Sequence, residues 1–209
     1  MGKDKTGREQ NINIDHQYQE RLIPYKTFLF FALTGSTILF LSLLLMLIIW
    51  LTHNSSVENF YMPKPFILST IVLLLSSYVI TLAKDAFKND DSKQLILSFT
   101  GSLGLSMFFT CLQFLGWKDL YNQGFFIDGE VGISLVYIIT GLHFLHVICG
   151  LLWQFYLSLR AYDVWNDPVK SLLYFSNRFE GTRIDLFSAY WHFVDGLWLC
   201  VFLTFLFAL

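Results

Sequence analysis

Residues 131–159 read VGISLVYIITGLHFLHVICGLLWQFYLSL, an apolar run that contains no Asp, Glu, Lys or Arg. A helix needs about 20 mostly apolar residues to cross the hydrocarbon core of a bilayer, so this run is long enough to span it with tilt or to project from it. Four further apolar runs occur at residues 27–51, 66–83, 95–115 and 186–209. The sequence therefore predicts an all-α fold, an integral membrane bundle of five transmembrane helices.

The composition of the whole chain supports this class. Of its 209 residues, 55% are hydrophobic, 18% aromatic and only 14% charged, whereas soluble domains carry roughly 25% charged residues. The formal net charge of −2 offers no basic surface, so we expect no nucleic-acid partner. We expect a polar cytoplasmic tail at residues 1–26 and one transmembrane domain at residues 27–209.

Lysine and arginine are distributed unequally between the two sides of the predicted bundle. The tail, the loop between the second and third runs and the loop before the last run hold twelve of the 14 basic residues, and the other side holds Lys64 and Lys118. Because cytoplasmic loops of membrane proteins carry the excess of Lys and Arg, this bias predicts that the N-terminus lies inside and the C-terminus outside.

Prolines and cysteines add two smaller expectations. Pro24 and Pro65 stand just before the first two runs, where a proline can begin a helix, and no predicted span contains a proline. The three cysteines lie inside apolar runs without the close spacing of a metal or redox motif, so we expect them to be small buried hydrophobic residues; they are Cys111, Cys149 and Cys200.

The ionisable residues inside the predicted spans are the candidate functional residues, because each is expensive in lipid. His143 and His146 are three residues apart on the fourth run, and so are His192 and Asp195 on the last. Residues three apart share one face of a helix, so the two pairs could face each other at similar depth. An Asp at the middle of a bilayer costs about 2.5–3.5 kcal/mol. We therefore expect it to be turned from lipid and paired with a histidine or with a backbone group of a neighbouring subunit.

Three interpretations of these residues remain open on spacing alone. They could form hydrogen bonds between helices, ligate a haem through His192 and a histidine of the fourth run, or carry protons through His192 and Asp195. No phosphate-binding loop, GxSxG, HExxH or CxxC motif is present. Apart from the haem alternative, we therefore predict no catalytic residue and no metal ligand in the chain, which is typical of a subunit that serves a larger complex.

Two motifs resemble those of a known family. YWHFVD at residues 190–195, followed by Leu197 and Trp198, and TGLHFLHVICG at residues 140–150 resemble two helix signatures of the cytochrome c oxidase subunit III family. Residues 104–113, with Trp117 and Gly124, are similar to the family's preceding helix and loop. Order and spacing match over residues 95–209. The matching positions include intramembrane polar residues (His143, His146, His192, Asp195) and aromatic residues (Trp117, Trp191, Trp198).

The chain also departs from the family pattern. The buried glutamate that the family usually carries in its first core helix is missing, since the corresponding place reads Thr34-Gly35. Gly116 stands where many members have glutamate before the tryptophan, and Asp185 stands where a glutamate commonly precedes the YWHFVD motif. Five spans instead of the seven of the mitochondrial form resemble a short bacterial version without the first two helices.

The resemblance implies a subunit without haem or copper of its own, multi-pass in the bacterial cytoplasmic (inner) membrane. It would pack on the catalytic subunit I of a haem–copper oxidase. Subunit I holds haem and copper, and the resemblance leaves open further copper in subunit II. The complex reduces dioxygen to water with electrons from cytochrome c and pumps protons. Other oxidase subunits belong to it, and the resemblance leaves open that it is part of a larger respiratory supercomplex. The isolated chain would then be no enzyme, although the complex is one.

The resemblance further implies bound phospholipid and support for oxygen access and proton uptake. Basic residues at the inner rim would each attract anionic headgroups by about 1 kcal/mol; the candidates are Lys26, Lys84, Lys88 and Lys93. Two alternatives stay open, a subunit III of a quinol oxidase and a haem-bearing membrane anchor. A small transporter is disfavoured, because the predicted helices are unbroken and contain a single acid.

Overall fold

The computed structural model of the chain describes residues 3–53 and 63–208, and the side chains of residues 22–53 and 63–207. These residues form six α-helices and no strand. The helices are α1 (Lys3–His53), α2 (Lys64–Lys88), α3 (Ser92–Asn122), α4 (Val131–Asn166), α5 (Pro168–Ser176) and α6 (Arg178–Ala208).

The predicted all-α class and the five apolar spans are confirmed, but the number of helices in the described chain is six, not five. The helices long and apolar enough to cross a membrane cover Leu22–His53, Lys64–Lys88, Ser92–Asn122, Val131–Asn166 and Arg178–Phe207. Each extends past the predicted run, because backbone hydrogen bonding continues where the apolar sequence stops. The sixth helix, α5, has nine residues and is too short to span.

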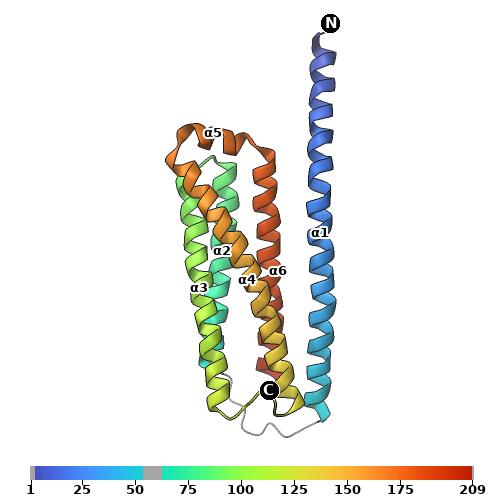
Figure 1. The fold of residues 1–209 in the computed structure, drawn as a ribbon, viewed down its shortest axis with the longest axis vertical. Helices are drawn as coiled ribbons and strands as arrows, with labels where there is room; N and C mark the ends of the chain where they lie inside the picture. Colours follow the sequence, from blue (N-terminus) through green and yellow to red (C-terminus); the bar gives the residue numbers. More distant parts are fainter. Residues whose placement is uncertain (1–2, 54–62, 209) are drawn as a thin grey trace.

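Helix α5 forms in the segment that the sequence analysis treats only as the loop before the last apolar run. The carboxylate of Asp167 accepts hydrogen bonds from the backbone N–H groups of Val169 and Lys170, and Pro168 occupies the first turn. Both are helix-starting features. In Figure 1 this helix lies across one end of the bundle, which we call the α5 end.

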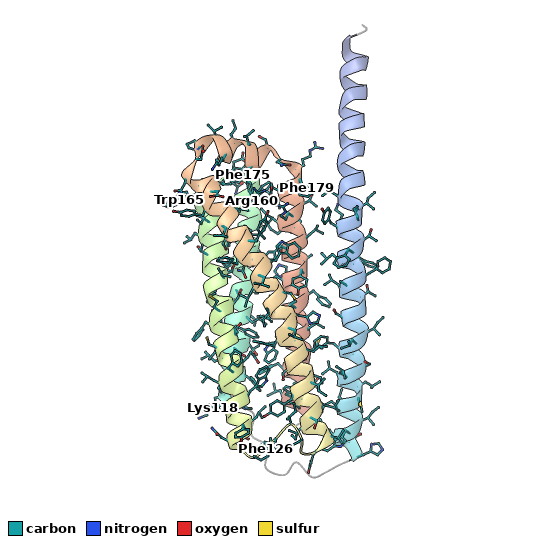
Figure 2. The ribbon with its side chains drawn as sticks, viewed as in Figure 1. Lys118, Phe126, Arg160, Trp165, Phe175 and Phe179 are labelled. Atoms are coloured by element: carbon teal, nitrogen blue, oxygen red, sulfur yellow. The ribbon has the colours of Figure 1, made fainter. Side chains whose placement is uncertain are left out.

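The helices are arranged as a four-helix bundle with α1 at its edge. Helix α2 packs most extensively on α3, α4 packs on α3 and α6, and α1 contacts α4 and α6 (Figure 1). The ends of the described chain lie at opposite ends of the molecule. Figure 2 places Arg160 at the α5 end and Lys118 at the opposite end, as the predicted grouping of basic residues requires.

Helix α1 differs from its prediction. It begins at Lys3, continues through the residues predicted to form a polar tail, and contains Pro24 in its interior instead of just before its start. The first span, Leu22–His53, therefore includes a proline. The apolar pattern marks where a helix enters lipid, whereas the Lys, Arg, Glu and Gln residues before Leu22 also favour helix. Hydropathy therefore does not define where this helix begins.

Large aromatic residues fill the bundle and fix how closely its helices approach. Trp198, Phe66 and Phe109 are fully buried in one apolar cluster, and Phe66 packs against α3 at Gly116. A Cβ atom at Gly116 would lie 2.1 Å from the Phe66 ring, so only glycine permits this contact.

The expected burial of the cysteines is wrong. All three are exposed on the surface of the described chain, without a disulfide. The physical reason is that apolar residues of a membrane protein can face lipid as well as the protein interior, so an apolar run does not imply burial within one chain.

Candidate functional site

The four predicted polar residues lie in four different environments. His143, on α4, is buried at 1% exposure. Its ring centroid lies 5.1 Å from that of Trp198 and 6.0 Å from that of Phe109. Neither ring nitrogen has a hydrogen-bond partner in the described chain. His143 therefore packs as an aromatic ring between α3 and α6.

His146, one turn along α4, instead connects α4 to α1. Its Nε2 lies 3.0 Å from the hydroxyl oxygen of Ser36, and its Nδ1 lies 2.8 Å from the carbonyl oxygen of Leu142. The hydroxyl of Tyr190 on α6 donates to the carbonyl of His146 itself, at 2.8 Å. This residue thus links three helices, which is the first of the three interpretations left open by spacing.

On α6, His192 is exposed and Asp195 is buried at 4% exposure. The Nδ1 of His192 lies 2.7 Å from the hydroxyl oxygen of Ser77 on α2. Ser77 also faces the carboxyl group of Asp195, but neither carboxyl oxygen has a hydrogen bond in the described chain. No hydrogen bond or ion pair joins these two residues to the histidines of α4 among the described contacts. The structure does not bring the two predicted pairs together.

The motif tryptophans are placed as packing residues. The indole N–H of Trp198 donates to the Thr70 hydroxyl at 3.0 Å, and that of Trp117 donates to the Thr140 hydroxyl at 3.1 Å. Trp191 is fully buried, and its N–H has no partner in the described chain. Two of the three thereby connect different helices by a hydrogen bond.

A buried polar network joining α2, α3 and α4 was missed by sequence reasoning. The amide of Gln154 donates to the Ser102 hydroxyl, and Ser106 lies 3.1 Å from Ser76 and 3.5 Å from the Gln154 amide oxygen. All four side chains are buried. The available signal was Gln154 itself, an amide inside the longest apolar run.

A charged cluster at the α5 end was also missed. Glu180 is buried at 4% exposure and accepts from Arg160 at 2.7 Å and from Arg183 at 3.0 Å. Burial, and then the charge of Glu180, raise the pKa of Tyr174 above its usual range, so its hydroxyl stays protonated. The i,i+3 spacing of Glu180 and Arg183 was the signal for half of this cluster.

The predicted headgroup lysines lie at the α5 end but differ in their contacts. Lys84 pairs with Asp185 at 2.9 Å, and Lys88 lies 3.9 Å from Asp85 with both side chains largely exposed. Lys26 and Lys93 are exposed. Exposed ion pairs contribute little to stability. These contacts therefore do not test whether the lysines bind lipid headgroups, which stays a prediction.

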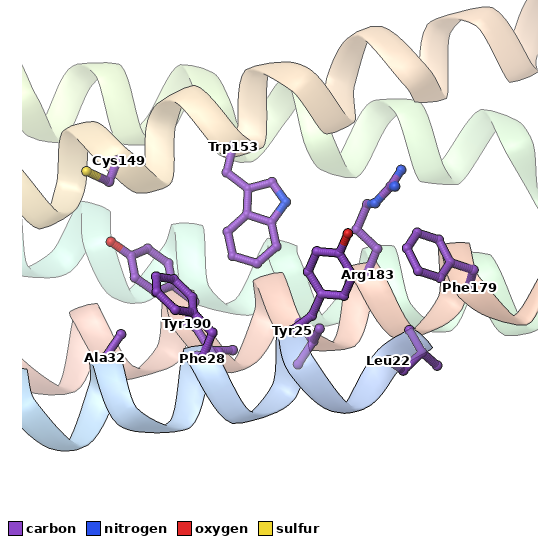
Figure 3. Close-up of a pocket in the computed structure, with 11 residues that line it drawn as sticks. Leu22, Tyr25, Phe28, Ala32, Cys149, Trp153, Phe179, Arg183 and Tyr190 are labelled. Carbon is purple, nitrogen blue, oxygen red and sulfur yellow. The ribbon is translucent and has the colours of Figure 1, made fainter. Parts of the chain in front are cut away.

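A cavity of about 450 Å³ opens between α1, α4 and α6 near the α5 end. Figure 3 shows its lining: Trp153 and Cys149 come from α4, Tyr25, Phe28 and Ala32 from α1, and Phe179, Arg183 and Tyr190 from α6. The walls are apolar and aromatic, with one guanidinium group, that of Arg183, which lies near the start of α6. The cavity is suited to an apolar ligand with an anionic or polar end.

The geometry does not support haem ligation by the predicted histidines. The His143 ring is enclosed by Phe109 and Trp198, which leaves no room for a porphyrin, and His192 faces Ser77 on the outer surface. In the part of the chain that the structure describes, no three His, Cys, Asp or Glu side chains gather to hold a metal ion.

Comparison with known proteins identifies similar chains. The family model of cytochrome c oxidase subunit III matches residues 27–208. Cytochrome c oxidase subunit 3 of Bacillus sp. (strain PS3) is 30% identical over 148 residues, 71% of this chain and 66% of that protein. The same subunit of Ornithorhynchus anatinus is 31% identical over 139 residues, 66% of this chain and 48% of that protein. The match thus spans about half the length of the latter.

A fused relative is also similar. The heme-copper oxidase subunit I+III of Aeropyrum pernix is 26% identical over 136 residues, which cover 65% of this chain and 16% of that protein.

Proposed function

Because this chain belongs to the cytochrome c oxidase subunit III family, we propose that it is the non-catalytic subunit III of a bacterial respiratory haem–copper oxidase. It lies in the cytoplasmic membrane with its N-terminus inside and packs on the catalytic subunit I. That partner subunit holds the haem and copper, and the complex reduces dioxygen to water with electrons from cytochrome c. The chain supports oxygen access and proton uptake without redox chemistry of its own.

The observation that carries this proposal is that the two family motifs pack against each other. His143 of the first motif lies against Trp198, which follows the second. A Cβ atom at Gly150, the last residue of the first motif, would lie 2.7 Å from the ring of Trp191 in the second. These contacts indicate that the motif residues serve to pack the two helices together, as expected of a structural subunit.

A fused relative supports subunit I as the partner. Since the Aeropyrum pernix protein carries subunits I and III in its name, a single chain can contain both. A fused chain keeps its two parts close together. The separate subunit proposed here would reach the same arrangement by contact within the membrane.

Phospholipid binding belongs to the same proposal. The cavity between α1, α4 and α6 falls within the volume range of roughly 300–1,000 Å³ of ligand sites. We infer that it takes an acyl chain, with Arg183 toward the headgroup region. Of the four predicted lysines, Lys26 directly follows a cavity-lining residue, Tyr25, in the sequence.

The lipid part is tested by filling the cavity. Ala32→Trp places a large ring where Ala32 lines the cavity, whereas Gly35→Trp changes an exposed position of α1 where a Cβ atom meets nothing within 4 Å. We expect Ala32→Trp alone to lower the amount of phospholipid that mass spectrometry detects on the purified protein. Equal lipid content in both variants would reject this site.

The functional assignment is tested by affinity purification of the tagged chain from membranes in mild detergent. We expect a haem–copper catalytic subunit to co-purify, with the haem spectrum of the complex. Recovery of the chain without any oxidase subunit would overturn the assignment. Turnover of the purified complex with reduced cytochrome c and with a quinol then identifies the electron donor.

A further inference from the structure

His192 is an exposed ionisable residue in the middle of a spanning helix. It is the fifteenth of the 31 residues of α6, which places it roughly 21 Å along the axis from the first residue at 1.5 Å per residue. Its side chain is exposed on the surface of the described chain. At that depth a surface faces hydrocarbon or another protein, and ionisable side chains at bilayer depth almost always face protein or water.

The ring of His192 is held in place by one nitrogen only. Nδ1 lies 2.7 Å from the Ser77 hydroxyl oxygen, which fixes the orientation of the ring. The hydrogen bonds of the described chain include none to the second nitrogen, Nε2. A ring fixed on one side presents its other nitrogen outward as a preoriented donor or acceptor.

Three exposed hydroxyl groups elsewhere in the spans are bonded within their own helices. The hydroxyls of Thr34, Ser42 and Thr100 are exposed, but each donates to a backbone carbonyl of its own helix three or four residues earlier. They are therefore compatible with lipid as they stand. The Nε2 atom of His192 has no such bond within its own helix, so it needs a hydrogen-bond partner from another molecule.

The surroundings of His192 suit a neighbouring helix. At 100° per residue, Asp185, Ala189, Gly196 and Leu203 share the outer side of α6 with it, and we call these five residues the His192 face. Asp185 is paired with Lys84 at 2.9 Å at its α5 end. A Cβ atom at Gly196 would meet nothing within 4 Å. This opening beside His192 permits close approach of a second helix backbone.

We propose that the His192 face is the docking surface for a transmembrane helix of the oxidase's catalytic subunit, which places a hydrogen-bonding group opposite Nε2 of His192. This inference rests on the proposed function and adds to it the face of contact. A hydrogen bond made there replaces an unsatisfied polar atom in lipid, so it fixes the depth at which the two helices meet.

The first test fills the opening at Gly196 with a leucine side chain. Gly196→Leu and Gly101→Leu are matched, because each replaces a helical glycine whose Cβ atom would meet nothing within 4 Å. Gly101 lies on α3, away from the His192 face. We expect Gly196→Leu to reduce co-purification of the catalytic subunit about ten-fold, equivalent to ~1.4 kcal/mol, and Gly101→Leu to leave it unchanged.

The second test separates the two ring nitrogens. The amide of Gln reaches about as far as Nε2, and the amide of Asn about as far as Nδ1. If Nε2 binds the partner, His192→Gln retains more catalytic subunit than His192→Asn. The opposite order would show that the contact with Ser77 is the important one and would overturn the proposal.

The outcomes keep the two proposals apart. A wild-type chain that captures no catalytic subunit rejects the proposed function. A wild-type chain that captures it equally with both glycine variants leaves the function standing and overturns the docking face. Capture of a second, differently tagged copy of this chain that only Gly196→Leu abolishes would overturn it in favour of self-association.

Discussion

At the scale of single residues, His143 and Asp195 are ionisable side chains buried in the bundle without a hydrogen-bond partner in the described chain. Buried polar groups in proteins are almost always bonded, to protein or to ordered water. We therefore expect ordered water at these two side chains. We expect Asp195 to contribute to the packing of α6 and to take no part in electron transfer.

Replacement of Asp195 by Asn tests this role. Asn keeps the size and a hydrogen-bonding group and removes the ionisable carboxyl, so we expect oxygen reduction by the assembled complex to be largely retained. Oxygen consumption of the purified complex measures it. A complex that contains Asp195→Asn in full amount yet loses turnover at once would favour the proton-pathway interpretation instead.

Replacement of the motif tryptophans by Phe separates hydrogen bonding from packing. Trp198 and Trp191 are both fully buried, but only Trp198 has a hydrogen bond in the described chain, to Thr70. Loss of this bond leaves the Thr70 hydroxyl oxygen without its donor. We therefore expect Trp198→Phe to lower the free energy of unfolding by about 1 kcal/mol more than Trp191→Phe does. Thermal unfolding in detergent measures the difference. Equal midpoints would show that the Trp198 bond makes no net contribution.

At the scale of helices, packing depends on positions where one helix leaves room for a ring of another. Gly150 and Gly141 belong to the same helix and the same motif, but only Gly150 lies against an indole ring, that of Trp191. The motif therefore contains one glycine required by contact with α6 and one that the described contacts leave unexplained.

Alanine substitution at these two glycines should have different effects. A Cβ atom at Gly150 would lie 2.7 Å from Trp191, and we expect Gly150→Ala to destabilise the protein by about 1–3 kcal/mol. A Cβ atom at Gly141 meets nothing within 4 Å, so Gly141→Ala should be neutral or stabilising by up to about 1 kcal/mol. Unfolding midpoints in the same detergent compare them. Similar destabilisation by both would contradict the observed α4–α6 contact.

At the scale of the whole molecule, the basic residues at the α5 end give a testable orientation. A reporter inserted beside Lys88, in the turn between α2 and α3, should lie in the cytoplasm, and a reporter fused after Leu209 should lie outside. Alkaline phosphatase and a fluorescent protein report the two sides by opposite signals. Reversed signals at both positions would reject the orientation, and equal signals would reject an odd number of spans between Lys88 and Leu209.

The sequence alone determined the class, the five spans and the family. These properties depend on local patterns, because twenty consecutive apolar residues indicate a span whatever surrounds them. The motifs at residues 140–150 and 190–195 are likewise contiguous. Sequence reasoning failed at the ends of helices, as with α1 and α5, because hydropathy reports the lipid boundary while capping and propensity decide where a helix ends.

Only the tertiary structure decided which polar residues meet. His146 contacts Ser36, 110 positions away in sequence, and Glu180 contacts Arg160 on another helix. Helical spacing shows that two residues share a face but not which neighbour that face meets. For the same reason the spacing of His192 and Asp195 did not predict that one is exposed and the other buried. That difference arises from where α2 packs on α6.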